Sequence, residues 1–104
     1  MTTIAATPKP PYYAVIFTSL KTPEDNGYQQ TAARMIALAS KQSGFLGIES
    51  AREEEGLGIT VSYWADTSSI QQWKENIEHQ QAQQQGRNQW YSDFKVRIAK
   101  VERG

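Results

Sequence analysis

The side chains that could do chemistry near neutral pH gather in one stretch of the chain, residues 63–91. This stretch holds all three tryptophans, Trp64, Trp73 and Trp90, together with Tyr91 and the single histidine, His79. Aromatic rings supply large apolar surfaces, and an imidazole changes its charge near neutral pH. These residue types together indicate a small-molecule pocket with aromatic walls and one group able to take a proton.

Each aromatic residue also has a structural interpretation. Trp73 has the helical spacing typical of a core residue, and Trp64, at the end of an expected strand, could serve a core or a pocket. Trp90 and Tyr91 could pack the connection to the last strand. As pocket residues, Trp73 would assist catalysis, while Trp64, Trp90 and Tyr91 would bind the substrate.

Two ionisable side chains could act in such a pocket. Asn76 can cap a helix, so we expect a helix break there that turns His79 toward the side of Trp73. His79 would then be the catalytic base, although a lone histidine is more often a surface or structural residue. Arg97 is expected to pair with Glu49 on the second strand, and binding of a substrate anion is the alternative.

Composition excludes several classes of protein. The 104 residues fit one domain, and Lys+Arg and Asp+Glu both number 11, which argues against a nucleic-acid surface. The chain has no cysteine and one histidine, so disulfides, a thiolate nucleophile and a multi-histidine metal site are not expected. No run approaches about 18 apolar residues, so we expect no membrane association and a cytoplasmic location.

The order of expected elements predicts the fold class. Strands are expected over 12–20, 45–53, 57–64 and 94–101, and helices over 27–43 and from about 67 onward. Residues 1–11 are expected to form a flexible lead-in, and 12–104 one domain. Gly44 is expected at a helix C-cap, residues 54–56 in a hairpin turn, and Asp66 within an N-cap segment. The order β-α-β-β-α-β predicts an α+β, ferredoxin-like fold, a four-stranded antiparallel sheet with helices on one face.

The first and third strands are apolar on both faces, which two helices on one side cannot cover. In the first strand Tyr13, Val15 and Phe17 point one way, and Ala14 and Ile16 the other. Exposed apolar patches of that size are unusual on monomers. We therefore expect a homodimer that buries the open face of the sheet.

Several motifs together resemble the antibiotic biosynthesis monooxygenase (ABM) family over about residues 12–103. They are the segment 44–47 opening a strand, the pair 63–64 closing another, Ile70-x-x-Trp73 with His79 downstream, residues 86–91, and the terminal segment 96–99. The resemblance implies a dimeric α+β barrel with a pocket between helices and sheet in each subunit. Several members of the family oxidise aromatic substrates with O₂ without metal or flavin.

A heme-degrading branch of that superfamily is a less favoured alternative. Its members resemble this chain at Trp73, but their axial histidine falls where this sequence has Gln83. His79 lies one helical turn earlier, and no asparagine occurs in the first strand. The resemblance thus favours no cofactor, with heme as the alternative.

Two functions are consistent with these features. The first is a cofactor-independent monooxygenase that oxidises a small aromatic or polyketide-like molecule with O₂. The second is a non-catalytic module that binds a small molecule and needs no base. An RNA-recognition domain shares the strand order, but its third strand needs stacking aromatics where this chain has Leu57, Ile59 and Ser62.

Overall fold

The computed structural model describes residues 3–23, 28–54, 56–83 and 91–104. Within these ranges, nothing is described of the side chains of residues 28, 29, 31 and 78–83. The elements are β1 (Tyr12–Lys21), α1 (Tyr28–Ser40), β2 (Phe45–Arg52), β3 (Leu57–Trp64), α2 (Thr67–Gln83) and β4 (Tyr91–Val101). The predicted β-α-β-β-α-β order is confirmed.

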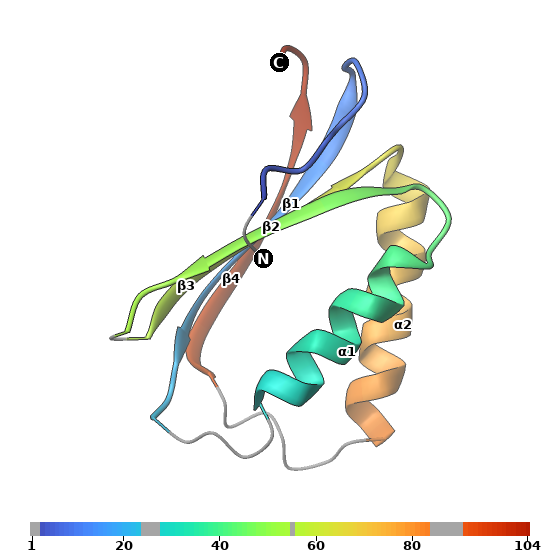
Figure 1. The fold of residues 1–104 in the computed structure, drawn as a ribbon. Helices are drawn as coiled ribbons and strands as arrows, with labels where there is room; N and C mark the ends of the chain where they lie inside the picture. Colours follow the sequence, from blue (N-terminus) through green and yellow to red (C-terminus); the bar gives the residue numbers. More distant parts are fainter. Residues whose placement is uncertain (1–2, 24–27, 55, 84–90) are drawn as a thin grey trace.

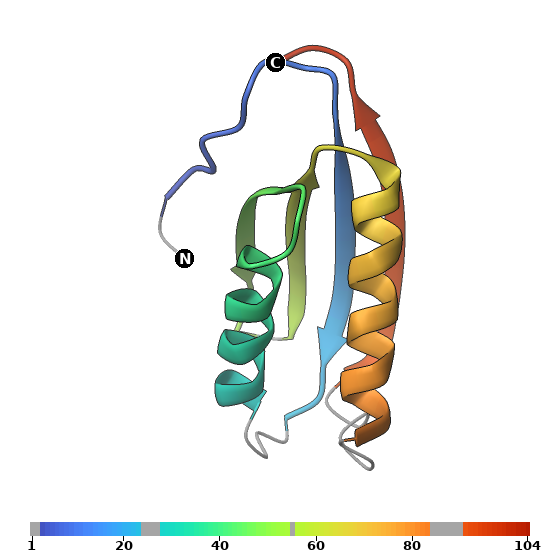
Figure 2. The same ribbon diagram turned by 90° about the vertical axis from the view of Figure 1, so that its right-hand side faces the viewer.

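The four strands form one antiparallel sheet in the order β2-β3-β1-β4 (Figure 1). Both helices lie on the same side of this sheet, with α1 over the β2 side and α2 over the β1–β4 side (Figure 2). We call this side the helix face and the opposite side the open face. The fold is thus the predicted ferredoxin-like α+β arrangement.

The core fills one end of the helix face. Trp64 is fully buried and stacks on Trp73, with ring centroids 6.1 Å apart and an interplanar angle of 26°. Ile70 and Ala39 complete the buried cluster, and Val15 packs against it from β1. Since Val15 lies on the helix face, alternation places Tyr13 and Phe17 there too, as predicted.

The start of the second helix agrees with the sequence prediction, but the end of the first helix does not. Asp66 caps α2, because its carboxylate accepts the Ser69 N–H at 2.8 Å. The helix α1 ends at Ser40, so Gly44 is not its C-cap. Gly44 instead forms the turn into β2 with φ +85°, where a Cβ would also lie 2.1 Å from the Ser69 hydroxyl.

The expected break in the second helix is absent. The helix α2 runs unbroken through Asn76, and residue 79 lies within it. Three apolar residues at helical spacing, Ile70, Trp73 and Ile77, all join the core cluster, so packing on the sheet favours a continuous helix over a cap at Asn76. On a regular helix, residue 79 lies about 120° around the axis from residue 73.

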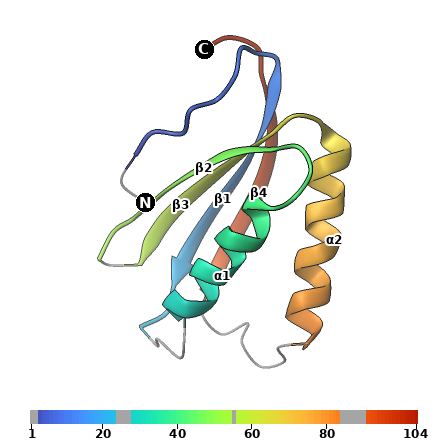
Figure 3. The ribbon, with the colours of Figure 1, turned by 45° about the vertical axis from the view of Figure 1, so that its right-hand side comes forward.

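Residues 3–11, expected as a lead-in, lie over one end of the open face (Figure 3). The Ala5 N–H donates to a Glu49 carboxylate oxygen at 2.9 Å, and the Tyr63 hydroxyl donates to the other at 2.6 Å. The hydroxyls of Thr7 and Tyr12 lie 3.0 Å apart. This N-terminal arm therefore covers part of the apolar surface that the sequence leaves for a partner.

Candidate functional site

In the described part of the chain, the two helices cover only part of the helix face. They pack on the sheet at the Trp64 end and diverge from it toward the other end (Figure 1). Two rows of the sheet lie at that far end. The strand register orders them, from β2 to β4, as Ser50-Thr60-Phe17-Val96 and Arg52-Gly58-Ser19-Phe94. We call them the uncovered rows.

The β4 side of the uncovered rows is apolar and accessible. Phe94 is 60% exposed and Val96 50%, although both lie on the helix face. Phe17 contacts Phe94 at 5.8 Å between centroids, and Tyr91 edge-on at 5.3 Å. Exposed apolar surface on the side that helices normally cover is typical of a ligand-binding surface.

The β2 side of these rows is polar and carries a fixed positive charge. The Arg52 guanidinium donates to the Ser19 hydroxyl at 2.7 Å and to the backbone carbonyls of Ser19 and Gly56. It also lies 5.7 Å from the centre of the Tyr91 ring. Beyond this row, a hollow of about 300 Å³ is lined by both positive and negative side chains: Lys21, Arg52, Glu53 and Glu54.

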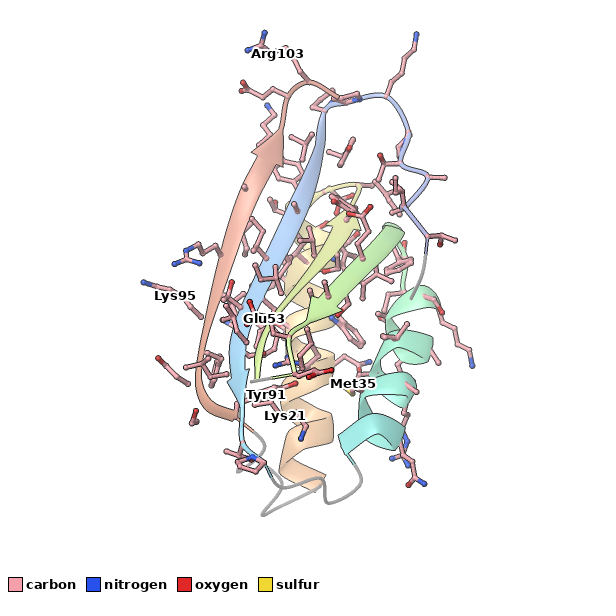
Figure 4. All side chains as sticks on the ribbon, turned by 60° about the vertical axis from the view of Figure 1, so that its left-hand side comes forward. Lys21, Met35, Glu53, Tyr91, Lys95 and Arg103 are labelled. Atoms are coloured by element: carbon pink, nitrogen blue, oxygen red, sulfur yellow. The ribbon has the colours of Figure 1, made fainter. Side chains whose placement is uncertain are left out.

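Among the sequence-predicted residues, the structure brings Tyr91 into this site. It pairs with Lys21 at the start of β4, and Figure 4 shows both at the same end of the sheet. Trp64 and Trp73 meet each other, but in the core; the Trp64 indole N–H donates to the Ser62 hydroxyl at 2.9 Å. Trp90 and the side chain of His79 lie outside the described residues.

Arg97 lies on the open face, away from the uncovered rows. It pairs with Ile16 on β1, and is exposed. Glu49 shares its row but stands on β2, three strand spacings or about 14 Å away, which is too far for an ion pair within one chain. A substrate-binding role for Arg97 stays a prediction, and it would require a ligand on the open face.

The sequence interpretation missed Arg52, Phe17 and Phe94. One signal was available for Arg52: a hairpin turn at 54–56 sets Arg52 opposite Gly58, and a glycine leaves room for a long side chain to cross the strand. A Cβ on Gly58 would lie 2.4 Å from the Arg52 guanidinium carbon. The contact of the Arg52 side chain with Ser19 could not be predicted, because it depends on β1 pairing beside β3.

Electrostatics on the open face centre on Glu49. Its hydrogen bonds from Tyr63 and from the Ala5 N–H lower the pKa of the Glu49 carboxyl. The same bond, with burial and the nearby negative charge, raises the pKa of Tyr63 to about 12. In the described part of the chain, no group of three metal-ligating side chains is placed to hold an ion, and no helix is long and apolar enough to cross a membrane.

Residues 11–85 match the profile of the antibiotic biosynthesis monooxygenase family. The chain belongs to this family. The Bacillus subtilis protein YqjZ, whose function is uncharacterised, is 54% identical over 100 residues, which are 96% of this chain and 88% of YqjZ. The match to the family includes the uncovered rows on β1, β2 and β3, and stops before β4.

Solved structures share the fold of this family member. SnoaB, a cofactor-independent oxygenase from Streptomyces nogalater, was solved as an asparagine-to-alanine mutant. It gives a TM-score of 0.70 at 13% identity and covers 89% of this chain and 95% of its own. A Pseudomonas aeruginosa protein gives 0.68 at 16% identity, covering 92% and 97%. A protein of unknown function from Nitrosomonas europaea gives 0.62 at 13% identity, covering 88% and 89%. At these identities the likeness is one of fold.

Proposed function

We propose that this family member is a monooxygenase that oxidises a small aromatic or polyketide-like molecule with O₂ and needs no metal, flavin or heme. The observation that carries the proposal is the set of exposed and half-buried rings on the helix face, Phe17, Tyr91 and Phe94, beside the fixed Arg52 guanidinium. Family membership and the fold shared with a cofactor-independent oxygenase support it.

The chemistry can proceed without an external reductant. A deprotonated phenol or quinol can itself give electrons to O₂. One oxygen atom then enters the substrate, and the other leaves as water with two hydrogens taken from the substrate. The protein has to bind the ring, take the proton and keep water from the reactive intermediate.

We propose His79 as the group that takes the proton, with Trp73 fixing α2 on the sheet through its stacking on Trp64. Because α2 is unbroken, the role of His79 no longer rests on a turn at Asn76. It rests on the imidazole being the one side chain of the chain whose ordinary pKa suits a base near neutral pH.

Oxygen uptake by the purified protein tests this function. With no added metal, flavin or heme, it should consume O₂ with some members of a panel of phenols and quinols. His79→Ala should lower that rate by about 10²–10⁴-fold, the usual contribution of a general base. Trp73→Phe should lower it less, because the ring stays apolar.

Three outcomes would contradict parts of the proposal. Unchanged turnover in His79→Ala eliminates the proposed base. Binding of ring compounds without any O₂ uptake leaves a non-catalytic binding module. Stoichiometric binding of added heme that His79→Ala abolishes would place the chain with the heme-dependent members of the superfamily.

We also propose that the protein acts as a cytoplasmic homodimer joined through the open face. Among the described residues, three large apolar side chains remain exposed there beyond the N-terminal arm: Leu20 at 42%, Leu57 at 39% and Ile59 at 45%. They lie on the two central strands, β1 and β3, where a second sheet would cover them.

A further inference from the structure

The uncovered rows divide into two chemically different halves. On β1 and β4 they present Phe17, Phe94 and Val96, with Tyr91 beside them. On β2 and β3 they present hydroxyls and a guanidinium rather than hydrocarbon. A ligand that fits both halves is apolar at one end and rich in oxygen at the other.

Arg52 is held in place before any ligand arrives. Its guanidinium is anchored to Ser19, which is only 2% exposed, and to the Gly56 carbonyl, and its side chain crosses the space left by Gly58. Ordering a long side chain ordinarily costs entropy, and here that cost is already met by the fold. The positive charge therefore stands at a defined point of the site.

The neighbouring row adds a hydrogen-bond donor. The hydroxyls of Ser50 and Thr60 lie 2.8 Å apart and share one hydrogen bond. Two hydroxyls carry two hydrogens, and that bond uses one, so the other hydrogen can be donated to a ligand. Ser50 precedes Arg52 by two residues on β2, a separation of about 6.6–6.8 Å on the same face.

We propose that this site selects aromatic molecules that carry a carboxylate. The ring lies on the β1–β4 half against Phe17 and Phe94. The carboxylate lies over β3, between the Ser50–Thr60 hydroxyls and the Arg52 guanidinium. Glu53 and Glu54 follow Arg52 toward the hairpin and line the hollow there. The inference rests on the proposed function for the location of the site, but it concerns binding and not turnover.

Binding of two matched probes tests the proposal independently of catalysis. 2-Naphthoate and 2-naphthamide have the same ring and nearly the same size, and only the first is charged at neutral pH. Titrations followed by protein NMR should show wild type binding 2-naphthoate at least about tenfold more tightly, as expected for a charge-assisted hydrogen bond. Its backbone shifts should centre on Gly58, Thr60 and Phe94.

We define the naphthoate preference as the Kd of 2-naphthamide divided by the Kd of 2-naphthoate. Arg52→Gln should reduce this ratio to about one while the Kd of 2-naphthamide stays unchanged. The matched control is Arg103→Gln, which removes the same charge from an exposed position beyond the end of β4 and should leave the preference intact. The double variant Ser50→Ala, Thr60→Val should lower the preference by about two- to tenfold. If Arg52→Gln does not fold, Gly58→Ala replaces it, because its Cβ displaces the guanidinium.

The proposal is overturned if wild type binds neither probe, or both equally. It is also overturned if Arg52→Gln keeps the preference, if Arg103→Gln loses it, or if the naphthoate shifts lie on the open face. An absence of O₂ uptake with any substrate, together with a naphthoate preference that depends on Arg52, would refute the proposed oxygenase and leave this inference standing.

Discussion

At the scale of single residues, Glu49 and Tyr63 are coupled through one short hydrogen bond. The bond from the Tyr63 hydroxyl is 2.6 Å long, and the same carboxylate accepts the Ala5 N–H of the N-terminal arm. The pKa of Glu49 is lowered and that of Tyr63 is raised to about 12. Each shift means that folding favours an ionised Glu49 and a protonated Tyr63.

The stabilisation from this pair should depend on pH at both ends of the scale. For Tyr63 it is present below the ordinary pKa of 10.0 and is lost as pH rises toward about 12. For Glu49 it is present above the ordinary pKa of 4.5 and is lost as pH falls through the lowered value. Tyr63→Phe should therefore lower the thermal unfolding midpoint most near neutral pH. A difference from wild type that stays constant from acid to alkaline pH would contradict this.

The two arginines show how far residue patterns predict a site. Alternation along β4 correctly sets Lys95 and Arg97 opposite to Phe94, Val96 and Ile98, and Figure 4 shows Lys95 pointing outward from β4. Alternation cannot tell which set faces the helices, because both faces of the sheet carry apolar residues. The register between β1 and β4 decides it: Arg97 lies on the open face, whereas Arg52, on β2, lies in the uncovered rows.

At the scale of elements, strand positions were predictable because β-branched and aromatic residues alternate between clear turn signals. The ends of the elements were harder to predict: β4 begins at Tyr91 and not at residue 94, and α1 ends at Ser40 and not at residue 43. The cap at Asp66 is confirmed by its bond to the Ser69 N–H. The break at Asn76 was wrong, since local capping preference is weaker than burial of a continuous apolar helix face.

Asn76 lowers the stability of the unbroken helix. Its side-chain oxygen is shielded from solvent and has no hydrogen-bond partner among the described residues. Replacing an unsatisfied buried polar group with an apolar group of similar shape is neutral or stabilising. Asn76→Leu should thus raise the free energy of unfolding by about 1–3 kcal/mol, measured by urea denaturation.

Gln72→Leu is the control for Asn76→Leu, because it adds a leucine at an exposed position of the same helix. Its effect should stay within about 0.5 kcal/mol. A lower free energy of unfolding in Asn76→Leu would contradict this prediction. It would mean that the Asn76 amide stabilises the fold through an interaction, for example with a bound ligand.

At the scale of the whole molecule, the order of the elements was enough to predict the fold, because short connections between alternating strands and helices allow few topologies. The N-terminal arm could not be anticipated in the same way. Residues 3–11 show no periodic pattern, and their place on the open face depends on Ala5 meeting Glu49, a residue 44 positions away. This arm covers part of the apolar open face but leaves Leu20, Leu57 and Ile59 exposed.

The remaining open face leads to the prediction of a dimer. Light scattering after size exclusion should give roughly twice 11.7 kDa at micromolar concentration. Ile59→Lys should shift the protein to the monomer mass, because a charge in the centre of a sheet-to-sheet interface lacks a partner. Ile98→Lys is the matched control: Ile98 is 58% exposed, against 45% for Ile59, but it lies on the helix face and should leave the dimer intact.

Wild type eluting as a monomer would refute the interface. Loss of the dimer in Ile98→Lys alone would instead move the interface to the helix face and beside the uncovered rows.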